Sequence, residues 1–265
     1  MANANAAVPI SGSVIFGNPA LLAKISRPIA AVSVLPRGLG LELEDTFLFN
    51  AAANVVLPLK EAGGAGLSWN GYFSSMETDT TYNENRLAAA YGICLFKKLS
   101  VGGTLLLESW GANGKDGLNL LSYGAPLSIN ANIGVHYQLS PNLGLALVGR
   151  RLFGSALSGG KDRDESAPTL CAGVGWLNPN WVGAFDAEYL FALSTFNLKL
   201  GFELQLAKGR LHLGAGAELL GLAQSFTPSL GIGLRLGPFV FDYAIAYPIP
   251  LGGAGNHLFT ITVGF

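Results

Sequence analysis

The residues best suited to chemistry are charged side chains at alternate positions of segments that are otherwise apolar or built from small residues. Ten share this setting: Arg86, Glu108, Arg150, Asp186, Glu188, Lys199, Glu203, Glu218, Arg235 and Asp242. Alternate positions of a strand point to one face, so these side chains are predicted to face away from the large apolar ones. Two interpretations remain open. The charges cancel one another and hold another part of the chain, or they line a polar path or a ligand site.

One pair of opposite charges can be placed more finely. If Leu193 and Ser194 form a two-residue turn, Glu188 lies directly opposite Lys199 on the next strand. A cross-strand pair of opposite charge stabilises a sheet by about 0.2–1 kcal/mol. We therefore expect an ion pair between these two side chains.

Other reactive residue types do not form the pattern of a catalytic or metal site. The three histidines, His136, His212 and His257, fall in separate segments without metal-ligand spacing. The sequence has no Gly-x-Ser-x-Gly nucleophile motif. Cys94 and Cys171 are expected on non-neighbouring strands, which favours free thiols over a disulfide. We expect no catalytic residues, no metal and no cofactor.

The composition is typical of a protein whose surface faces lipid. Only 12% of the 265 residues are charged, whereas soluble domains carry about 25%. No run reaches the roughly 20 apolar residues that a transmembrane helix needs. Only helices and closed barrels satisfy their backbone hydrogen bonds in lipid, so a membrane location implies a barrel. The net charge of −1 favours no nucleic-acid partner.

Hydrophobicity repeats with a period of two, which indicates strands. The alternation predicts strands at 30–35, 47–59, 64–73, 85–96, 100–110, 127–139, 143–152, 169–177, 181–191, 195–206, 211–219, 228–236, 238–247 and 257–265. These are about fourteen, an even number as in single-chain bacterial barrels. A soluble sandwich is the alternative for any one hairpin, but its polar face would be rich in Lys and Glu rather than in Gly, Ala, Ser and Asn. The prediction is an all-β, antiparallel, up-and-down transmembrane barrel over 29–265.

The connections between the predicted strands alternate in length. Short turns are predicted at 97–98, 140–142, 178–180, 208–209 and 237–238, and longer loops at 74–84, 111–126, 153–168 and 248–256. Short turns of outer-membrane barrels face the periplasm, so both chain ends are predicted to be periplasmic. A barrel must be exported, and the first residues lack the basic and apolar regions of a signal peptide. We therefore expect a leader to have been removed.

The last predicted strand carries a membrane signature. Phe259, Ile261, Val263 and Phe265 alternate with small or polar residues and are predicted to face lipid. A C-terminal aromatic residue resembles the signal that the barrel-assembly machinery reads. That machinery and the lipid bilayer are therefore expected partners.

Residues 1–28 precede the barrel and form a separate segment. Asn18-Pro19 is a turn initiator, and the residues from Ala20 to Ala23 can begin a short helix. The segment is either a periplasmic tail or a plug folded into the barrel. Its length and its mainly small, uncharged side chains favour the plug.

A resemblance to a known family rests on these features. Asn18-Pro19-Ala20 ahead of a barrel of about fourteen strands, together with the segments 231–238 and 241–244 and the terminal Phe265, resembles the FadL-like outer-membrane transporter superfamily. Within it, the chain is similar to the PorV/PorQ branch associated with type IX secretion. The outer loops are shorter than in typical members.

The resemblance implies a plugged barrel in a bacterial outer membrane. Its first implied function is transport of hydrophobic or small molecules, with a hydrophobic ligand, lipid or detergent in the lumen. The alternative is a scaffold or carrier for type IX secreted surface proteins, which would make those cargo proteins partners.

Overall fold

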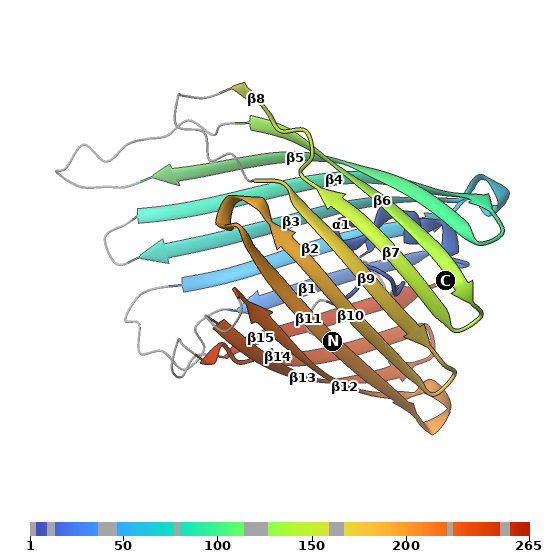
Figure 1. The fold of residues 1–265 in the computed structure, drawn as a ribbon. Coiled ribbons are helices and arrows are strands. Elements are labelled where there is room, and N and C mark those ends of the chain that lie inside the picture. Colours follow the sequence, from blue (N-terminus) through green and yellow to red (C-terminus); the bar gives the residue numbers. More distant parts are fainter. Residues whose placement is uncertain are drawn as a thin grey trace.

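The computed structural model describes residues 4–9, 14–36, 47–76, 80–113, 127–158, 167–221, 225–249 and 255–265. Short helical elements near the start are followed by one large antiparallel sheet (Figure 1). The helical elements are α1 (Val14–Gly17), η1 (Pro19–Lys24), η2 (Lys60–Ala62), η3 (Phe191–Leu193) and η4 (Ala207–Gly209). No helix within these described ranges is long and apolar enough to cross a bilayer.

The sheet contains fourteen long strands and one short strand. They are β1 (Ile29–Pro36), β2 (Phe47–Pro58), β3 (Gly64–Met76), β4 (Thr80–Phe96), β5 (Leu99–Asn113), β6 (Leu127–Ser140), β7 (Leu143–Arg150), β8 (Ser155–Ser158), β9 (Thr169–Leu177), β10 (Trp181–Leu190), β11 (Thr195–Leu206), β12 (Leu211–Leu220), β13 (Ser225–Leu236), β14 (Phe239–Ala246) and β15 (Asn256–Gly264). The long strands match all fourteen predicted segments.

The sheet closes because its first and last strands pair. Ile29 of β1 lies opposite Gly264 of β15, and every other long strand pairs with long strands on both sides. The short strand β8 pairs with the end of β6 that β7 does not reach. Closure leaves no free edge in the wall, as a barrel in lipid requires. The predicted closed barrel is therefore confirmed.

Two predicted strand starts are wrong. β4 begins at Thr80 rather than at residue 85, and β13 begins at Ser225 rather than at Pro228. The extension of β4 carries no alternation of large apolar side chains, and the extension of β13 adds a single one, Phe226, which Thr227 and Pro228 separate from the alternating segment. The loop predicted at 74–84 is correspondingly shorter. The other long predicted loops lie largely on residues outside the described ranges.

The outer surface of the barrel is apolar on every side. Each long strand exposes at least one large apolar side chain, as seen for Val32, Val55, Leu67, Leu87, Leu105, Ile133, Leu147, Val174, Phe185, Leu200, Leu213, Leu230, Phe241 and Ile261. The alternate residues of the same strands therefore face inward.

Short connections gather at one end of the barrel. The turns at 97–98, 141–142, 178–180, 207–210 and 237–238 lie there, as do the start of β1 and the end of β15 (Figure 1). We call this end the short-turn rim. The connection between β10 and β11, which comprises η3 and Ser194 and is equally short, lies at the opposite end, so the predicted alternation of short and long connections holds only in part.

Candidate functional site

The Asn18-Pro19-Ala20 motif lies inside the barrel, against the inward face of the wall (Figure 1). The Asn18 side chain is fully buried. Its Nδ2 donates to the carbonyl oxygens of Ala6 at 2.7 Å and Val135 at 3.3 Å, and its Oδ1 accepts from the N–H of Ala20 at 3.0 Å. Asn18 thus caps η1 and joins two parts of the N-terminal segment to β6.

Glycines in the wall make room for this motif. A Cβ atom at Gly134 would overlap Asn18 Oδ1, and one at Gly102 would lie 2.5 Å from the carbonyl carbon of Pro19. Because these glycines face inward, the backbone of the segment approaches the sheet closely. The complementary fit indicates one defined position for η1.

Apolar side chains hold the same region. Four residues of the N-terminal segment pack against four inward residues of the wall; the cluster is Val14, Ile15, Leu21, Leu22, Val56, Ala88, Ala90 and Leu106. In addition, Thr104 Oγ1 donates to the carbonyl of Ile15 at 2.8 Å. This arrangement is a small hydrophobic core inside the barrel, separate from the apolar outer surface.

The first described residues reach a different part of the wall. Asp186 of β10 accepts hydrogen bonds at Oδ2 from the N–H groups of Asn5 at 2.8 Å and Ala6 at 3.0 Å. Ala6 also packs against Val148 and Cys171. The predicted lumenal carboxylate at position 186 therefore binds the backbone of the N-terminal segment.

A charged group beside it links four strands, β7, β9, β10 and β11. Glu188 of β10 forms ion pairs with Arg150 of β7 and, at 3.0 Å, with Lys199 of β11, and it accepts from the hydroxyl of Thr169 at 3.0 Å. Arg150 also donates to the carbonyl of Gly17 at 3.2 Å. This group connects the wall to the end of α1.

The ion pair expected between Glu188 and Lys199 is confirmed, but its predicted register is wrong. Lys199 lies opposite Asp186, and Glu188 lies opposite Asn197. The connection comprises η3 and Ser194, which adopts a left-handed conformation with φ 47°. The longer connection shifts the pairing by two residues and makes the ion pair diagonal.

A second charged group forms around Glu108 of β5. Its carboxylate binds Arg86 at 3.0 Å, Arg151 at 3.3 Å and Asn130 at 2.5 Å. Arg151 is not among the predicted lumenal residues, because strict alternation from Arg150 places residue 151 outside. Arg151 instead follows the end of β7 with φ 54°, which directs its side chain inward.

The remaining predicted lumenal charges lie on β11 to β14. Glu203 binds His212 at 3.1 Å, and Glu218 accepts from Asn197 at 2.7 Å. Arg235 and Asp242 also lie on inward positions of this half. The ten predicted residues therefore divide into separate groups rather than forming one site. Within the described residues, no group of three or more His, Cys, Asp or Glu could hold a metal ion.

The two halves of the interior differ in exposure. Inward side chains of the strands under the N-terminal segment, such as Ser68, Thr104 and Ala184, are buried. Inward residues of the other half, such as Gly216 and Ala246, remain partly exposed. The described part of the segment thus covers one side of the interior.

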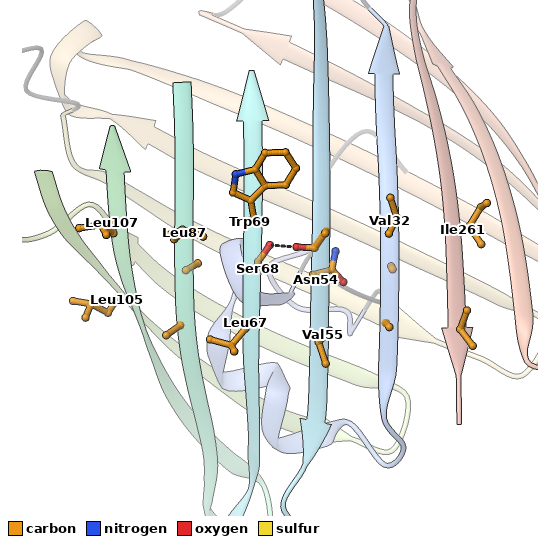
Figure 2. A pocket seen from close by; sticks show the side chains of 16 residues that line it. Val32, Asn54, Val55, Leu67, Ser68, Trp69, Leu87, Leu105, Leu107 and Ile261 are labelled. Carbon is orange, nitrogen blue, oxygen red and sulfur yellow. Dashed lines mark hydrogen bonds between the residues drawn. The ribbon is translucent and has the colours of Figure 1, made fainter. Parts of the chain in front are cut away.

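A groove lies on the opposite, outward face of the wall (Figure 2). It has a volume of about 720 Å³ and crosses six neighbouring strands from β15 through β1 to β5. Two rows of outward side chains line it. One row is Val263, Ala30, Val55, Leu67, Ala89 and Leu105, and the other is Ile261, Val32, Ala53, Trp69, Leu87 and Leu107. We call it the transverse groove.

The C-terminal strand faces outward as predicted. Phe259 and Ile261 are each 49% exposed, and Phe265 is 76% exposed. Val263 lies on the same face and lines the transverse groove. Recognition of this strand by assembly machinery stays a prediction.

Solved structures with similar architecture include monoaromatic hydrocarbon channels and a FadL homologue. The Pseudomonas putida toluene transporter TodX superposes with a TM-score of 0.70 at 11% identity, over 96% of this chain and 94% of that one. A TodX mutant, described as a monoaromatic hydrocarbon channel, gives 0.71 at 13% identity, over 96% and 95%. A Pseudomonas aeruginosa FadL homologue gives 0.64 at 11% identity, over 99% and 95%.

The chain shares the fold of these channels. This FadL-type fold agrees with the architecture that the Asn18-Pro19-Ala20 resemblance implied. No family model and no curated protein matches the sequence. The finer resemblance to the PorV/PorQ branch is not confirmed, since the similar structures reported above are transport channels and a FadL homologue.

Proposed function

We propose that this protein is a plugged channel that passes hydrophobic small molecules across a bacterial outer membrane. The observation that carries the proposal is an N-terminal segment bound inside a barrel with the FadL-type fold. The similar proteins include a toluene transporter and a monoaromatic hydrocarbon channel. The apolar belt around the strands supports membrane embedding, because charged side chains at such positions cost about 2–4 kcal/mol at the bilayer midplane.

Residues 1–28 act as the plug in this proposal. Their described part is held by two kinds of contact, an apolar cluster around Leu21 and Leu22 and hydrogen bonds to Asp186. Residues 4–8 contact the wall through small side chains, Val8 and the hydrogen bonds to Asp186, a smaller set of contacts than the apolar cluster of η1. In this proposal they separate from β9 and β10, with loss of the Asn18–Ala6 hydrogen bond, while η1 stays in place. Such a movement would widen the partly exposed half of the interior.

The short-turn rim faces the periplasm in this proposal, with both chain ends on that side. The partners are the lipid bilayer, a hydrophobic small molecule and the barrel-assembly machinery. No observation on the described residues favours the carrier role for type IX cargo.

A reversible crosslink tests the role of the plug. Ala6 packs against the native Cys171, so Ala6→Cys offers a disulfide that fixes residues 4–8 to β9. We expect oxidised cells to take up labelled toluene at least tenfold more slowly than the same cells after reduction. The variant Ala6→Cys with Cys171→Ala is the matched control and should be insensitive to oxidation. Equal uptake by the crosslinked and reduced proteins contradicts the proposal.

A further inference from the structure

We propose that the inward face of the barrel mouth, at the end opposite the short-turn rim, binds aromatic molecules that carry a hydroxyl group, such as phenols. The site lies on the ends of β3, β4 and β5, at residues 70–76, 80–86 and 108–113, which we call the lip. The proposal rests on the transport function proposed above and names a class of substrate that the channel would bind first.

The lip is the part of the wall that projects furthest from the short-turn rim. β4 has 17 residues and β5 has 15, whereas β10 and β12 have 10 each. β3, β4 and β5 extend past the ends of these shorter strands (Figure 1). The inward face of the lip therefore stands above the level at which the shorter strands end.

The lip reaches beyond the apolar belt. Tyr82 is fourteen residues from Phe96 at the short-turn rim, which is about 48 Å along a strand. A strand tilt of about 40° makes this about 37 Å along the barrel axis, whereas the apolar belt of such barrels is about 25 Å tall. Asn83 and Asn85 occupy the outward positions of β4 at this level. The lip therefore lies in water rather than in lipid.

An acid of the lip lies between aromatic rings. Glu84 of β4 is directly opposite Tyr72 of β3 and Trp110 of β5, and all three side chains face inward. Tyr82 shares this face, and the centroid of its ring is 5.9 Å from that of Tyr72 and 6.4 Å from that of Trp110. The rings therefore form a row across three strands, with the carboxylate of Glu84 beside it.

The carboxylate of Glu84 can accept a hydrogen bond from a ligand. Its Oε1 accepts from the Tyr82 hydroxyl at 2.7 Å, and its Oε2 lies 3.5 Å from Nη2 of Arg86. A carboxylate has about four acceptor positions, so these two contacts with described residues leave room for a further donor. The Glu84 side chain is 36% exposed, so a ligand in the mouth can reach it.

The charges of the lip favour a neutral donor over an ion. Arg86 also binds Glu108 at 3.0 Å, and Arg151 binds Glu108 at 3.3 Å. Two acids and two arginines therefore balance one another. An anionic ligand would meet both carboxylates, and a cationic ligand would meet both guanidinium groups. A hydroxyl group donates to Glu84 without bringing a charge.

The rings favour an aromatic molecule. Aromatic rings attract one another with centroids about 4.5–7 Å apart, which is the spacing already found within the row. A flat ligand can extend this row. Toluene would contact the same rings, but it would cover Glu84 and Arg86 without replacing their hydrogen bonds to water. The lip therefore prefers phenols without excluding toluene from the channel.

A matched pair of molecules tests the proposal. Para-fluorophenol and fluorobenzene differ in the hydroxyl group alone, and fluorine NMR follows the binding of each to the protein in nanodiscs. Empty nanodiscs give the partitioning of each molecule into lipid, and heat-modifiable migration in gels verifies that every variant is folded. We expect wild type to bind para-fluorophenol at least tenfold more tightly than fluorobenzene.

Three variants separate the lip from the rest of the barrel. Glu84→Leu removes the acceptor, so its preference for para-fluorophenol should fall below twofold. Trp110→Ala removes one ring of the row and should weaken binding of para-fluorophenol at least fivefold. Trp69→Ala is the matched control, because Trp69 lies on the outward face of β3 in the transverse groove; it should bind as wild type does.

Equal binding of the two molecules to wild type, or binding of neither, overturns the proposal. So does a preference that survives in Glu84→Leu, or a loss in Trp69→Ala as large as that in Trp110→Ala. Tighter binding of benzoate, tetramethylammonium or maltose than of para-fluorophenol would assign the lip to another class of ligand and overturn the proposal as well.

Failure of this site and failure of the transport function give different results. A barrel that takes up toluene and binds no para-fluorophenol refutes the site on the lip alone. A barrel that binds para-fluorophenol at the lip, but whose toluene uptake is unaffected by the plug crosslink, refutes the proposed function alone.

Discussion

The carboxylate of Asp186 accepts a hydrogen bond at 3.0 Å from the backbone N–H of Ala6, 180 residues earlier in the chain. A second bond from Asn5 reaches the same oxygen at 2.8 Å. One side chain of the wall therefore holds the beginning of the N-terminal segment, and its removal has a local and measurable effect.

Replacing this carboxylate should free residues 4–9 without unfolding the barrel. Hydrogen bonds to charged groups contribute about 1.5–3 kcal/mol, so Asp186→Ala should increase hydrogen exchange at Asn5 and Ala6 at least tenfold. Hydrogen-exchange mass spectrometry provides the measurement. Glu218→Gln is the control, because Glu218 binds Asn197 in the other half of the interior. Unchanged exchange in Asp186→Ala would show that the two hydrogen bonds do not hold the segment.

A methyl group at Gly134 should displace the Asn18 motif. Its Cβ would overlap Asn18 Oδ1, and overpacking of this kind costs about 1–3 kcal/mol. We expect Gly134→Ala to lower the unfolding temperature in detergent and to make the segment sensitive to protease. Gly103→Ala is the matched control on the adjacent strand, since its Cβ would meet nothing closer than 3.8 Å. Equal behaviour of both variants would argue against the observed position of Asn18.

Neutralising Glu188 should destabilise the barrel more than neutralising an exposed acid. Glu188→Gln leaves Arg150 and Lys199 without their shared partner, and breaking a buried pair costs about 3–5 kcal/mol. Glu84, whose side chain is 36% exposed, pairs with Arg86 near water, where a salt bridge contributes about 0–1 kcal/mol. Urea unfolding in detergent gives the loss in free energy of unfolding for Glu188→Gln and for Glu84→Gln. A smaller loss for Glu188→Gln would contradict the structural role assigned to this carboxylate.

The orientation of the barrel in the outer membrane can be determined by labelling single cysteines. In a background of Cys94→Ala and Cys171→Ala, Ala192→Cys lies in η3 and Lys208→Cys lies in η4 at the short-turn rim. With that rim in the periplasm, a membrane-impermeant maleimide should label intact cells only at position 192. Both positions should react once the outer membrane is permeabilised. Labelling confined to position 208 in intact cells would reverse the proposed orientation.

The local sequence pattern was sufficient to predict the strands of the barrel wall, but not the contacts that their inward side chains make. Alternation of Phe196, Leu198 and Leu200 with Asn197 and Lys199 identified β11 and both of its faces. A strand in lipid must separate large apolar from polar residues, so its period is visible over a few residues. The polar start of β4 carried no such contrast and was missed.

The contacts of the residues inside the barrel could be identified only from the tertiary structure. The motif at Asn18 was recognisable in the chain, yet its partners Ala6 and Val135 were not, because no periodicity relates residues so far apart. Arg151 was missed for a different reason, since a single left-handed residue at the end of β7 reverses the expected direction of its side chain.

The sequence by itself determined the strands, their inward and outward faces and the closed barrel, because burial in lipid imposes a period of two on every strand. Only the tertiary structure decided which inward charges meet and how the N-terminal segment is held. It also decided where Ala30, Ala53 and Ala89 open a groove. These features depend on the register between strands, and register follows from turn geometry and side-chain fit across the whole barrel.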